Sequence, residues 1–253
     1  MSLSEQYTLS IRLSADGFSF SVFNPLNGGG TTVHDYTVDE SLSLTANLKQ
    51  AINEIEWLAA PYRRVNVLIA DKRVTYLPLE HFEDEQAEQL FHYNHPKRDN
   101  ELVQYNILHK NNVVVLFGMD KSAHTLLKEH FPQANFYAQA TPLIEYLAIK
   151  SRLGNNRKMY ACISKESIGI YSFERGQLLL ANTYACTNTD DRLYYLLYIW
   201  KQLGFEQERD ELHLTGHLAD KEQLLAELRK FIRQVFVMNP ATNLDLQAII
   251  QCE

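Results

Sequence analysis

The chain has 253 residues, of which 45% are hydrophobic and 22% charged, and its formal net charge is −7. This composition is globular and long enough for two lobes, and it excludes a disordered or low-complexity protein. The acidic balance disfavours nucleic acid as a partner, and the basic run Arg63, Arg64, Lys72 and Arg73 is interpreted as a solvated turn beside a strand.

The length of the apolar segments and the spacing of the cysteines indicate the cellular compartment of the protein. The longest apolar runs, such as Val113–Phe117, are far shorter than the roughly 20 residues that cross a bilayer. The first residues lack a signal-peptide pattern, and the three cysteines contain no CxxC motif that would indicate a zinc site. We therefore expect a cytoplasmic protein without membrane insertion.

The first 70 residues alternate in polarity and then adopt a helical period. Alternation predicts three antiparallel strands, at Tyr7–Leu13, Phe18–Phe23 and Thr31–Val38. A helix follows, capped by Asp39 or Ser41. Its apolar stripe comprises Leu44, Leu48, Ala51, Ile52, Ile55 and Leu58. The continuous apolar run Val65–Ala70 then predicts a strand covered on both faces.

The middle of the chain mixes short strands and helices. Strands are predicted at Val74–Leu79, Glu101–Leu108, Asn112–Phe117 and Asn135–Ala138. Helices are predicted at Glu83–Tyr93, Lys121–His130 and Pro142–Arg152.

The opening pattern returns after residue 158. Strands are predicted at Met159–Ser164, Ile168–Phe173, Gln177–Ala185, Glu211–Leu214 and Val235–Val237, and helices at Asp190–Leu203 and Gln223–Ile232. A β-β-β-α-β unit thus occurs twice, at about residues 7–70 and 159–214. An internal duplication of this kind is a fold-level signal.

Three segments carry a resemblance to a known superfamily: Leu9–Phe20 (LSIRLSADGFSF), Tyr160–Phe173 (YACISKESIGIYSF) and Glu211–Leu218 (ELHLTGHL). They resemble the two phosphate loops and the adenosine loop of the actin-like ATPase superfamily. More narrowly, the chain resembles an uncharacterised bacterial family of that superfamily. The order VTYLPLEHF, EDEQAEQLFHYN, ELVQYNIL and VVVLFGM resembles the module inserted in the actin-like proteins of type IV pilus assembly and cell division.

This resemblance implies an α/β protein with a duplicated ribonuclease H-like, two-lobed fold and a small inserted strand-helix-strand-strand module. The implied division is a first lobe at residues 1–70 and 133–152, an inserted module at 71–132 and a second lobe at 153–253.

Active members of the superfamily need glycines in both phosphate loops and an acidic residue on the first strand of each lobe, which handles Mg²⁺ and the attacking water. Here Arg12 stands at the first acidic position, and Cys162 occupies that position in the second loop. The adenosine loop has His217 in place of its second glycine. The vestigial nucleotide cleft implied by the resemblance comprises Arg12, Ser14, Asp16, Ser164, Lys165, Ser167, Thr215, Gly216 and His217.

These substitutions predict a non-catalytic protein, a pseudo-ATPase that binds an unknown protein partner as a scaffold. We expect no catalytic residue, no metal and no required ATP. The alternative is an ATP-binding switch or weak ATPase that uses Asp16 or Glu166 as an unconventional acid. A small-molecule kinase has less support, because no acidic base stands in a recognisable context. The oligomeric state stays open.

Other patterns favour structural explanations. Gly28–Gly30 lacks the strand and the GK[ST] ending of a phosphate-binding loop and predicts a hairpin connection. The group His81, Glu88, His92 and His95 lacks the regular spacing of a zinc site. In the aromatic cluster of the helix Asp190–Leu203, Trp200 is predicted to face the sheet, and Tyr194 and Tyr198 to lie on the face between the lobes or on an exposed face. The cluster is assigned mainly to core or cleft lining, with a partner-binding patch as the alternative.

Overall fold

The computed structural model describes residues 3–14, 17–26, 30–216, 221–238 and 242–251. The chain forms two compact units, one of Met1–Ile107, Val113–Pro142 and Ile249–Glu253, the other of Leu108–Asn112 and Leu143–Ala248. The described helices include none long and apolar enough to span a membrane. The boundaries predicted for the lobes and the inserted module stay a prediction.

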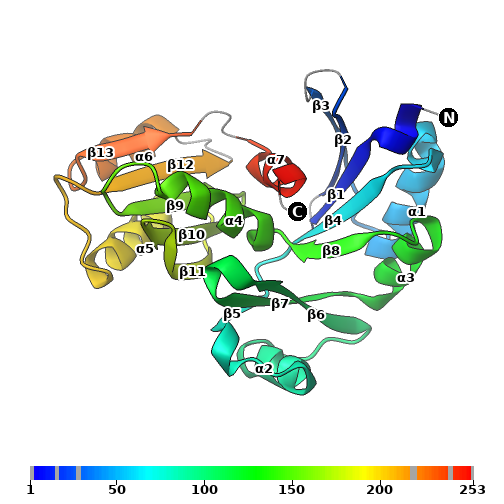
Figure 1. The fold of residues 1–253 in the computed structure, drawn as a ribbon, viewed down its shortest axis with the longest axis horizontal. Coiled ribbons are helices and arrows are strands. Elements are labelled where there is room, and N and C mark those ends of the chain that lie inside the picture. Colours follow the sequence, from blue (N-terminus) through cyan, green and yellow to red (C-terminus); the bar gives the residue numbers. More distant parts are fainter. Residues whose placement is uncertain (1–2, 15–16, 27–29, 217–220, 239–241, 252–253) are drawn as a thin grey trace. The chain divides into compact units, whose positions relative to one another are not determined.

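The first unit contains a five-stranded sheet in the order β3-β2-β1-β4-β8 (Figure 1). Its strands are β1 (Thr8–Ser14), β2 (Gly17–Asn24), β3 (Gly30–Tyr36), β4 (Arg64–Ala70) and β8 (Asn135–Ala138). The predicted meander is confirmed, because β2 runs antiparallel to both β1 and β3. β4 is parallel to β1 and to β8, and its Val65, Val67 and Leu68 are fully buried, as a continuous apolar run predicts.

Two helices of this unit pack against one another, α1 (Leu44–Glu54) and α3 (Lys121–His130). The predicted cap of α1 is wrong: Ser43 is the N-cap and accepts a hydrogen bond from the Ala46 N–H. Asp39 instead closes the preceding turn, where it accepts hydrogen bonds from the backbone and hydroxyl of Ser41. Either residue suits a cap chemically, so the choice depends on where the chain turns.

A three-stranded sheet follows within the same unit, in the order β5-β7-β6. Its strands are β5 (Val74–Pro78), β6 (Glu101–Leu108) and β7 (Val113–Asp120), and its helix is α2 (Ala87–Asn94). The helix begins four residues after the predicted Glu83, because a 3-10 turn occupies Asp84–Gln86. Short 3-10 turns also lie at Leu3–Gln6, Glu56–Ala59, Leu79–His81 and His109–Asn111.

One side chain connects β6 to the five-stranded sheet. The amide of Asn106 donates to the Phe136 carbonyl at 3.0 Å and accepts from the Ala138 N–H at 2.9 Å. Its oxygen also accepts from the Thr141 hydroxyl at 2.7 Å. The side chain therefore supplies backbone hydrogen bonds to β8, as a neighbouring strand would.

The second unit repeats the first sheet in the order β11-β10-β9-β12-β13 (Figure 1). The strands are β9 (Lys158–Ile163), β10 (Ser167–Glu174), β11 (Gln177–Ala185), β12 (Glu211–Gly216) and β13 (Gln234–Val237). β10 is antiparallel to β9 and β11, whereas β12 is parallel to β9 and β13. Strand order and direction match those of the first sheet, so the predicted duplication is confirmed.

The remaining helices are α4 (Ala140–Ser151), α5 (Thr189–Gln202), α6 (Lys221–Leu228) and α7 (Leu244–Gln251). The prediction for α6 lies too far along the chain, because the helix ends at Leu228 and turns follow. The helix α7 was not predicted, although its Leu246 and Ala248 are fully buried. Asn188, rather than the acidic pair that follows it, is the N-cap of α5, and Asp190 and Asp191 lie in the first turn as favourable helix-dipole charges.

Candidate functional site

The first candidate loop joins β1 to β2, and its side chains form a row across three strands. Arg12 lies opposite Ser19, and Ser19 lies opposite Asp35 on β3. The Arg12 guanidinium donates to the Ser19 hydroxyl at 2.8 Å, and that hydroxyl donates to the Asp35 carboxylate at 2.6 Å. The carboxylate of Asp35, two strands away from β1, thus offsets the charge of Arg12 through a neutral hydroxyl.

The turn of this hairpin is held by Ser14, whose hydroxyl donates to the Gly17 carbonyl at 2.7 Å. Asp16, which we named as a candidate acid, lies outside the described residues, as does Ala15. Asp35 is the residue that the sequence analysis missed here. Its position on the alternating third strand, facing the same side as the basic residue of the first, was the available signal.

The second candidate loop, Ser164–Ser167, joins β9 to β10. The Ser164 N–H and hydroxyl both donate to the Ser167 carbonyl, at 2.9 and 3.1 Å. The two hydroxyls lie 2.7 Å apart, within hydrogen-bonding distance. These side chains therefore satisfy each other across the turn, while Lys165 and Glu166 are exposed.

A buried arginine supports this loop. Arg192, in the first turns of α5, is only 5% exposed and donates to the carbonyls of Ser164 and Lys165, at 3.2 and 3.5 Å. The Glu166 carbonyl accepts from the Cys186 N–H at 3.0 Å. The carbonyls of the loop are thus bound by α5 and by the residue that follows β11. Arg192 was not predicted as part of this loop; its signal in the sequence is a basic residue directly after the acidic residues that begin a helix.

Cys162 stands on β9, at the position that the resemblance assigns to an acidic residue. Burial raises the pKa of its thiol, and the charge of Asp245 raises it further, so the thiol stays protonated at neutral pH. A protonated thiol is a weak hydrogen-bonding group and not a ligand for Mg²⁺, which prefers oxygen.

The adenosine-loop residues end β12, beside β9. Thr215 lies opposite Cys162, and Gly216 lies opposite Ile163. Thr215 is 2% exposed. Gly216 has φ +96°, and a Cβ there would overlap the carbonyl oxygen of Ile163. The glycine is therefore required by strand packing, whether or not a nucleotide binds. His217 lies outside the described residues.

We expect Gly216→Ala to lower the free energy of unfolding by at least about 2 kcal/mol, through backbone strain and overlap with β9. Gly204→Ala is the matched control: φ is +64° there, but no atom lies within 4 Å of the added Cβ. The control should cost about 1 kcal/mol, from the left-handed backbone alone. Urea unfolding of both variants measures the difference, and equal losses would contradict the overlap.

The second unit therefore brings together Ser164, Lys165, Ser167, Thr215 and Gly216 at one end of β9 and β12. In the first unit, Arg12 and Ser14 belong to the single hairpin of β1 and β2.

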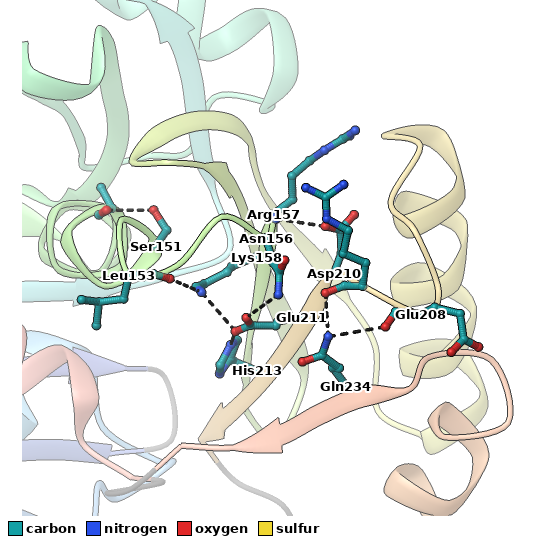
Figure 2. A network of polar contacts seen from close by, with 12 residues as sticks. Ser151, Leu153, Asn156, Arg157, Lys158, Glu208, Asp210, Glu211, His213 and Gln234 are labelled. Atoms are coloured by element: carbon teal, nitrogen blue, oxygen red, sulfur yellow. Dashed lines mark hydrogen bonds and ion pairs between the residues drawn. The ribbon is translucent and has the colours of Figure 1, made fainter.

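A second group of polar residues lies in the same sheet, at the start of β9 and β12 (Figure 2). The Lys158 ammonium, with a side chain 7% exposed, lies 3.1 Å from the Glu211 carboxylate and donates to the Leu153 carbonyl at 2.6 Å. The Asn156 amide donates to the Glu211 carboxylate at 3.2 Å, and the Nε2 atom of His213 lies 2.9 Å from the same carboxylate. The residues come from two segments of the chain, 153–158 and 211–213, and no sequence motif indicates them.

Aromatic rings enclose the histidine of this group. His213 stacks between Tyr160 and Phe236, with ring centroids 5.0 and 5.2 Å away. Burial lowers the pKa of His213, although Glu211 opposes the change. For Glu211 burial acts to raise the pKa, but hydrogen bonds from His213, Lys158 and Asn156 outweigh it and hold the pKa below its ordinary value. The arrangement stabilises a neutral imidazole beside an ion pair, which suits a structural role.

The histidines considered as metal ligands make other contacts. His92 lies 3.8 Å from Glu88, its other nitrogen lies 3.1 Å from the His95 carbonyl, and His95 packs on the Phe91 ring. Within the described ranges, no group of three or more His, Cys, Asp or Glu side chains is arranged to hold a metal ion.

The aromatic residues of α5 divide between the core and the surface. Trp200 is 3% exposed and packs on Phe205, as predicted. Tyr194 and Tyr198 are 61% and 50% exposed, in agreement with the exposed position that was one alternative for them, and stack on each other as helical neighbours four residues apart.

Two five-stranded sheets with one repeated strand order, each with an antiparallel hairpin of its first two strands, are the architecture of the actin-like ATPase fold. The chain belongs to the family described as "Protein of unknown function (DUF3822)", whose model matches residues 1–235.

Solved structures agree with this fold. A protein of Bacteroides thetaiotaomicron VPI-5482, described as having an actin-like ATPase fold and unknown function, is 62% identical over 100% of this chain and 99% of its own, with a TM-score of 0.94. A chain of the PilM–PilN type IV pilus biogenesis complex is 12% identical, and the match covers 94% of this chain and 89% of that chain, with a TM-score of 0.61. Component A of (R)-2-hydroxyglutaryl-CoA dehydratase from Acidaminococcus fermentans is 6% identical, and the match covers 96% of this chain and 95% of that chain, with a TM-score of 0.52. No curated protein matches the chain.

Proposed function

We propose that this protein is a pseudo-ATPase, an actin-like fold that serves as a protein-binding scaffold component and does not hydrolyse ATP. One observation carries the proposal: the strand positions that need an acid hold Arg12 and Cys162. Arg12 is engaged with Ser19, and the Cys162 thiol is protonated.

Neither group can serve magnesium chemistry. A guanidinium repels a divalent cation, and a protonated thiol neither binds Mg²⁺ nor accepts a proton from water. The described donors at these two positions therefore do not fit Mg²⁺. The loop around Ser164 further supports the proposal, because the Ser164 N–H and hydroxyl, which a phosphate would need as donors, donate to the Ser167 carbonyl.

A protein with this fold that does not hydrolyse ATP can still bind another protein. The PilM chain, which shares the fold, forms a complex with PilN. We extend to this chain only the general role of a component that binds another protein, by analogy of fold. A cytoplasmic location agrees with this role.

We expect the purified protein to release no phosphate from ATP and Mg²⁺ above the buffer rate, and to give no heat of ATP binding in calorimetric titration. Hydrolysis that disappears in Asp16→Asn or Glu166→Gln would refute the proposal and favour a weak ATPase. Micromolar binding without hydrolysis, lost in Lys165→Ala, would favour an ATP-dependent switch. Lys165 is the better probe, because it is exposed whereas Gly216 is needed for packing.

Partner capture from the native cell, followed by mass spectrometry, tests the binding role. A scaffold should retain the same protein with and without ATP, and equally in Lys165→Ala. Loss of that protein on adding ATP would contradict a nucleotide-independent scaffold.

A further inference from the structure

The outer edge of β11 is unpaired by any strand in the described part of the chain, because β11 ends the sheet order next to β10. β11 is nine residues long and contains no charged residue and no proline, with the sequence QLLLANTYA. Edge strands usually carry charge or proline that blocks further pairing, or they are short. A long, uncharged edge is therefore a surface that can accept another strand.

The direction of the backbone groups on this edge follows from one contact. The Cys186 N–H donates to the Glu166 carbonyl, toward the β10 side. The register from Leu180 to Ala185 is regular, with its only irregularity nearer Gln177. Backbone groups alternate in direction along a strand, so those of Ala181, Thr183 and Ala185 point outward.

A side chain covers one of these outward groups. The Thr183 N–H donates to the amide oxygen of Asn182 at 2.8 Å. That oxygen stands where the carbonyl of an added strand would stand. Because Asn182 is exposed, its side chain can turn away and release the N–H at small cost.

Tyrosines extend the surface from this edge across α5. Tyr184 of β11 stacks on Tyr195, at 4.5 Å between centroids. Tyr195 contacts Tyr194 edge-on, and Tyr194 stacks on the exposed Tyr198. Tyrosine is enriched in protein interfaces because it buries a large apolar area with little loss of conformational entropy.

We propose that a second copy of this chain pairs with β11, antiparallel and centred on Thr183. Each Thr183 then exchanges backbone hydrogen bonds with Thr183 of the second copy, and Ala181 does so with Ala185 of the second copy. The amide of Asn182, released from the Thr183 N–H, lies opposite Tyr184 of the second copy, on the face that carries α5.

Charge favours a copy of the same chain as the occupant. Identical strands meet without like-charge repulsion, because β11 carries no charge. At one end of β11 the exposed Glu166, Asp190 and Asp191 outnumber Lys165. At the other end Arg175 stands with Glu174 in the hairpin turn, and Lys201 lies in the last turn of α5. Antiparallel pairing directs the acidic end of one copy toward the more basic end of the other.

Sedimentation velocity and light scattering of the full chain, from about 1 to about 100 µM, test this pairing. The expected mass at the upper concentration is twice 29.3 kDa. A single species of 29.3 kDa throughout would overturn the proposal, and would leave the proposed scaffold role untouched.

Charge exchange at Thr183 tests the register. Thr183→Lys and Thr183→Glu should each raise the dimer dissociation constant at least roughly tenfold, because like charges then face each other. An equimolar mixture should restore dimers, which are heterodimers, since only pairing centred on this residue brings the two side chains together. If the mixture of the two variants forms no dimers, the proposed register is wrong.

Thr183→Pro removes the outward N–H and leaves the hydrogen bonds to β10 intact. It should weaken the dimer at least roughly tenfold, with circular dichroism and Tm near wild type. Thr31→Lys, on the exposed edge strand β3 of the other sheet, is the matched control and should leave the dimer unchanged. A dimer that Thr183→Pro does not weaken would overturn the assignment to β11.

Discussion

Glu211→Leu should lower the free energy of unfolding by about 3–5 kcal/mol, because it leaves the Lys158 ammonium buried without its carboxylate. The side chains of the pair are 7% and 16% exposed, so water does not replace the missing partner. Removal of Glu211 also takes away the acceptor of Asn156 and His213. Denaturant unfolding measures the loss.

Glu208→Leu is the matched control for this prediction. Glu208 pairs with Arg233 at 2.7 Å, but both side chains are more than 70% exposed, and such pairs contribute about 0–1 kcal/mol. If Glu211→Leu costs no more than the control, Lys158 is not held as an ion pair in solution.

The same group gives the protein a pH dependence with a definite sign. Glu211 and His213 both have a lowered pKa, so the unfolded chain binds more protons as the solution is acidified. Stability should therefore fall below pH 6.5, the ordinary histidine value, and further below 4.5, the ordinary glutamate value. His213→Phe, which keeps an aromatic ring between Tyr160 and Phe236, should flatten the upper part of this fall.

Glu101→Leu should cost a similar amount, about 3–5 kcal/mol, in the first unit. Arg73 and Glu101 form a bidentate pair, at 2.5 and 3.2 Å, with side chains 6% and 9% exposed. The guanidinium also donates to the Pro96 carbonyl and lies over the Phe91 ring. Gly118 leaves the space for the carboxylate, since a Cβ there would lie 2.5 Å from it.

A double variant distinguishes the cost of an unpaired buried charge from the cost of lost packing. Arg73→Met with Glu101→Leu removes both charges, so it should be more stable than Glu101→Leu alone. Glu88→Leu, which breaks an exposed pair with Lys97, should cost about 1 kcal/mol or less. A double variant as unstable as the single one would contradict the buried-charge explanation.

Local pattern determined most of the elements. Alternating segments such as Tyr7–Leu13 and Phe18–Phe23 became the strands β1 and β2, because alternation places the apolar side chains on one face of a strand. The repeat of that pattern after residue 158 was sufficient to indicate the duplicated fold. Exact ends were less predictable: the α1 cap moved to Ser43, and α2 began at Ala87.

The candidate site divides in the same way. The resemblance to the superfamily was sufficient to predict that Arg12 and Cys162 stand at the positions of its acidic residues, since only residue type and position were required. The partners of these loops depended on the fold. Asp35 reaches Arg12 through Ser19, and Arg192 reaches the second loop from a helix 28 residues further along the chain.

Only the tertiary structure decided which charges are buried together. Lys158 and Glu211 are 53 positions apart, and Arg73 and Glu101 are 28 apart, so no local period relates them. Parallel pairing of β9 with β12 brings the first two together at the starts of adjacent strands. A sequence determines which side chains can ionise, but their energies depend on distance and desolvation, which only the packed chain defines.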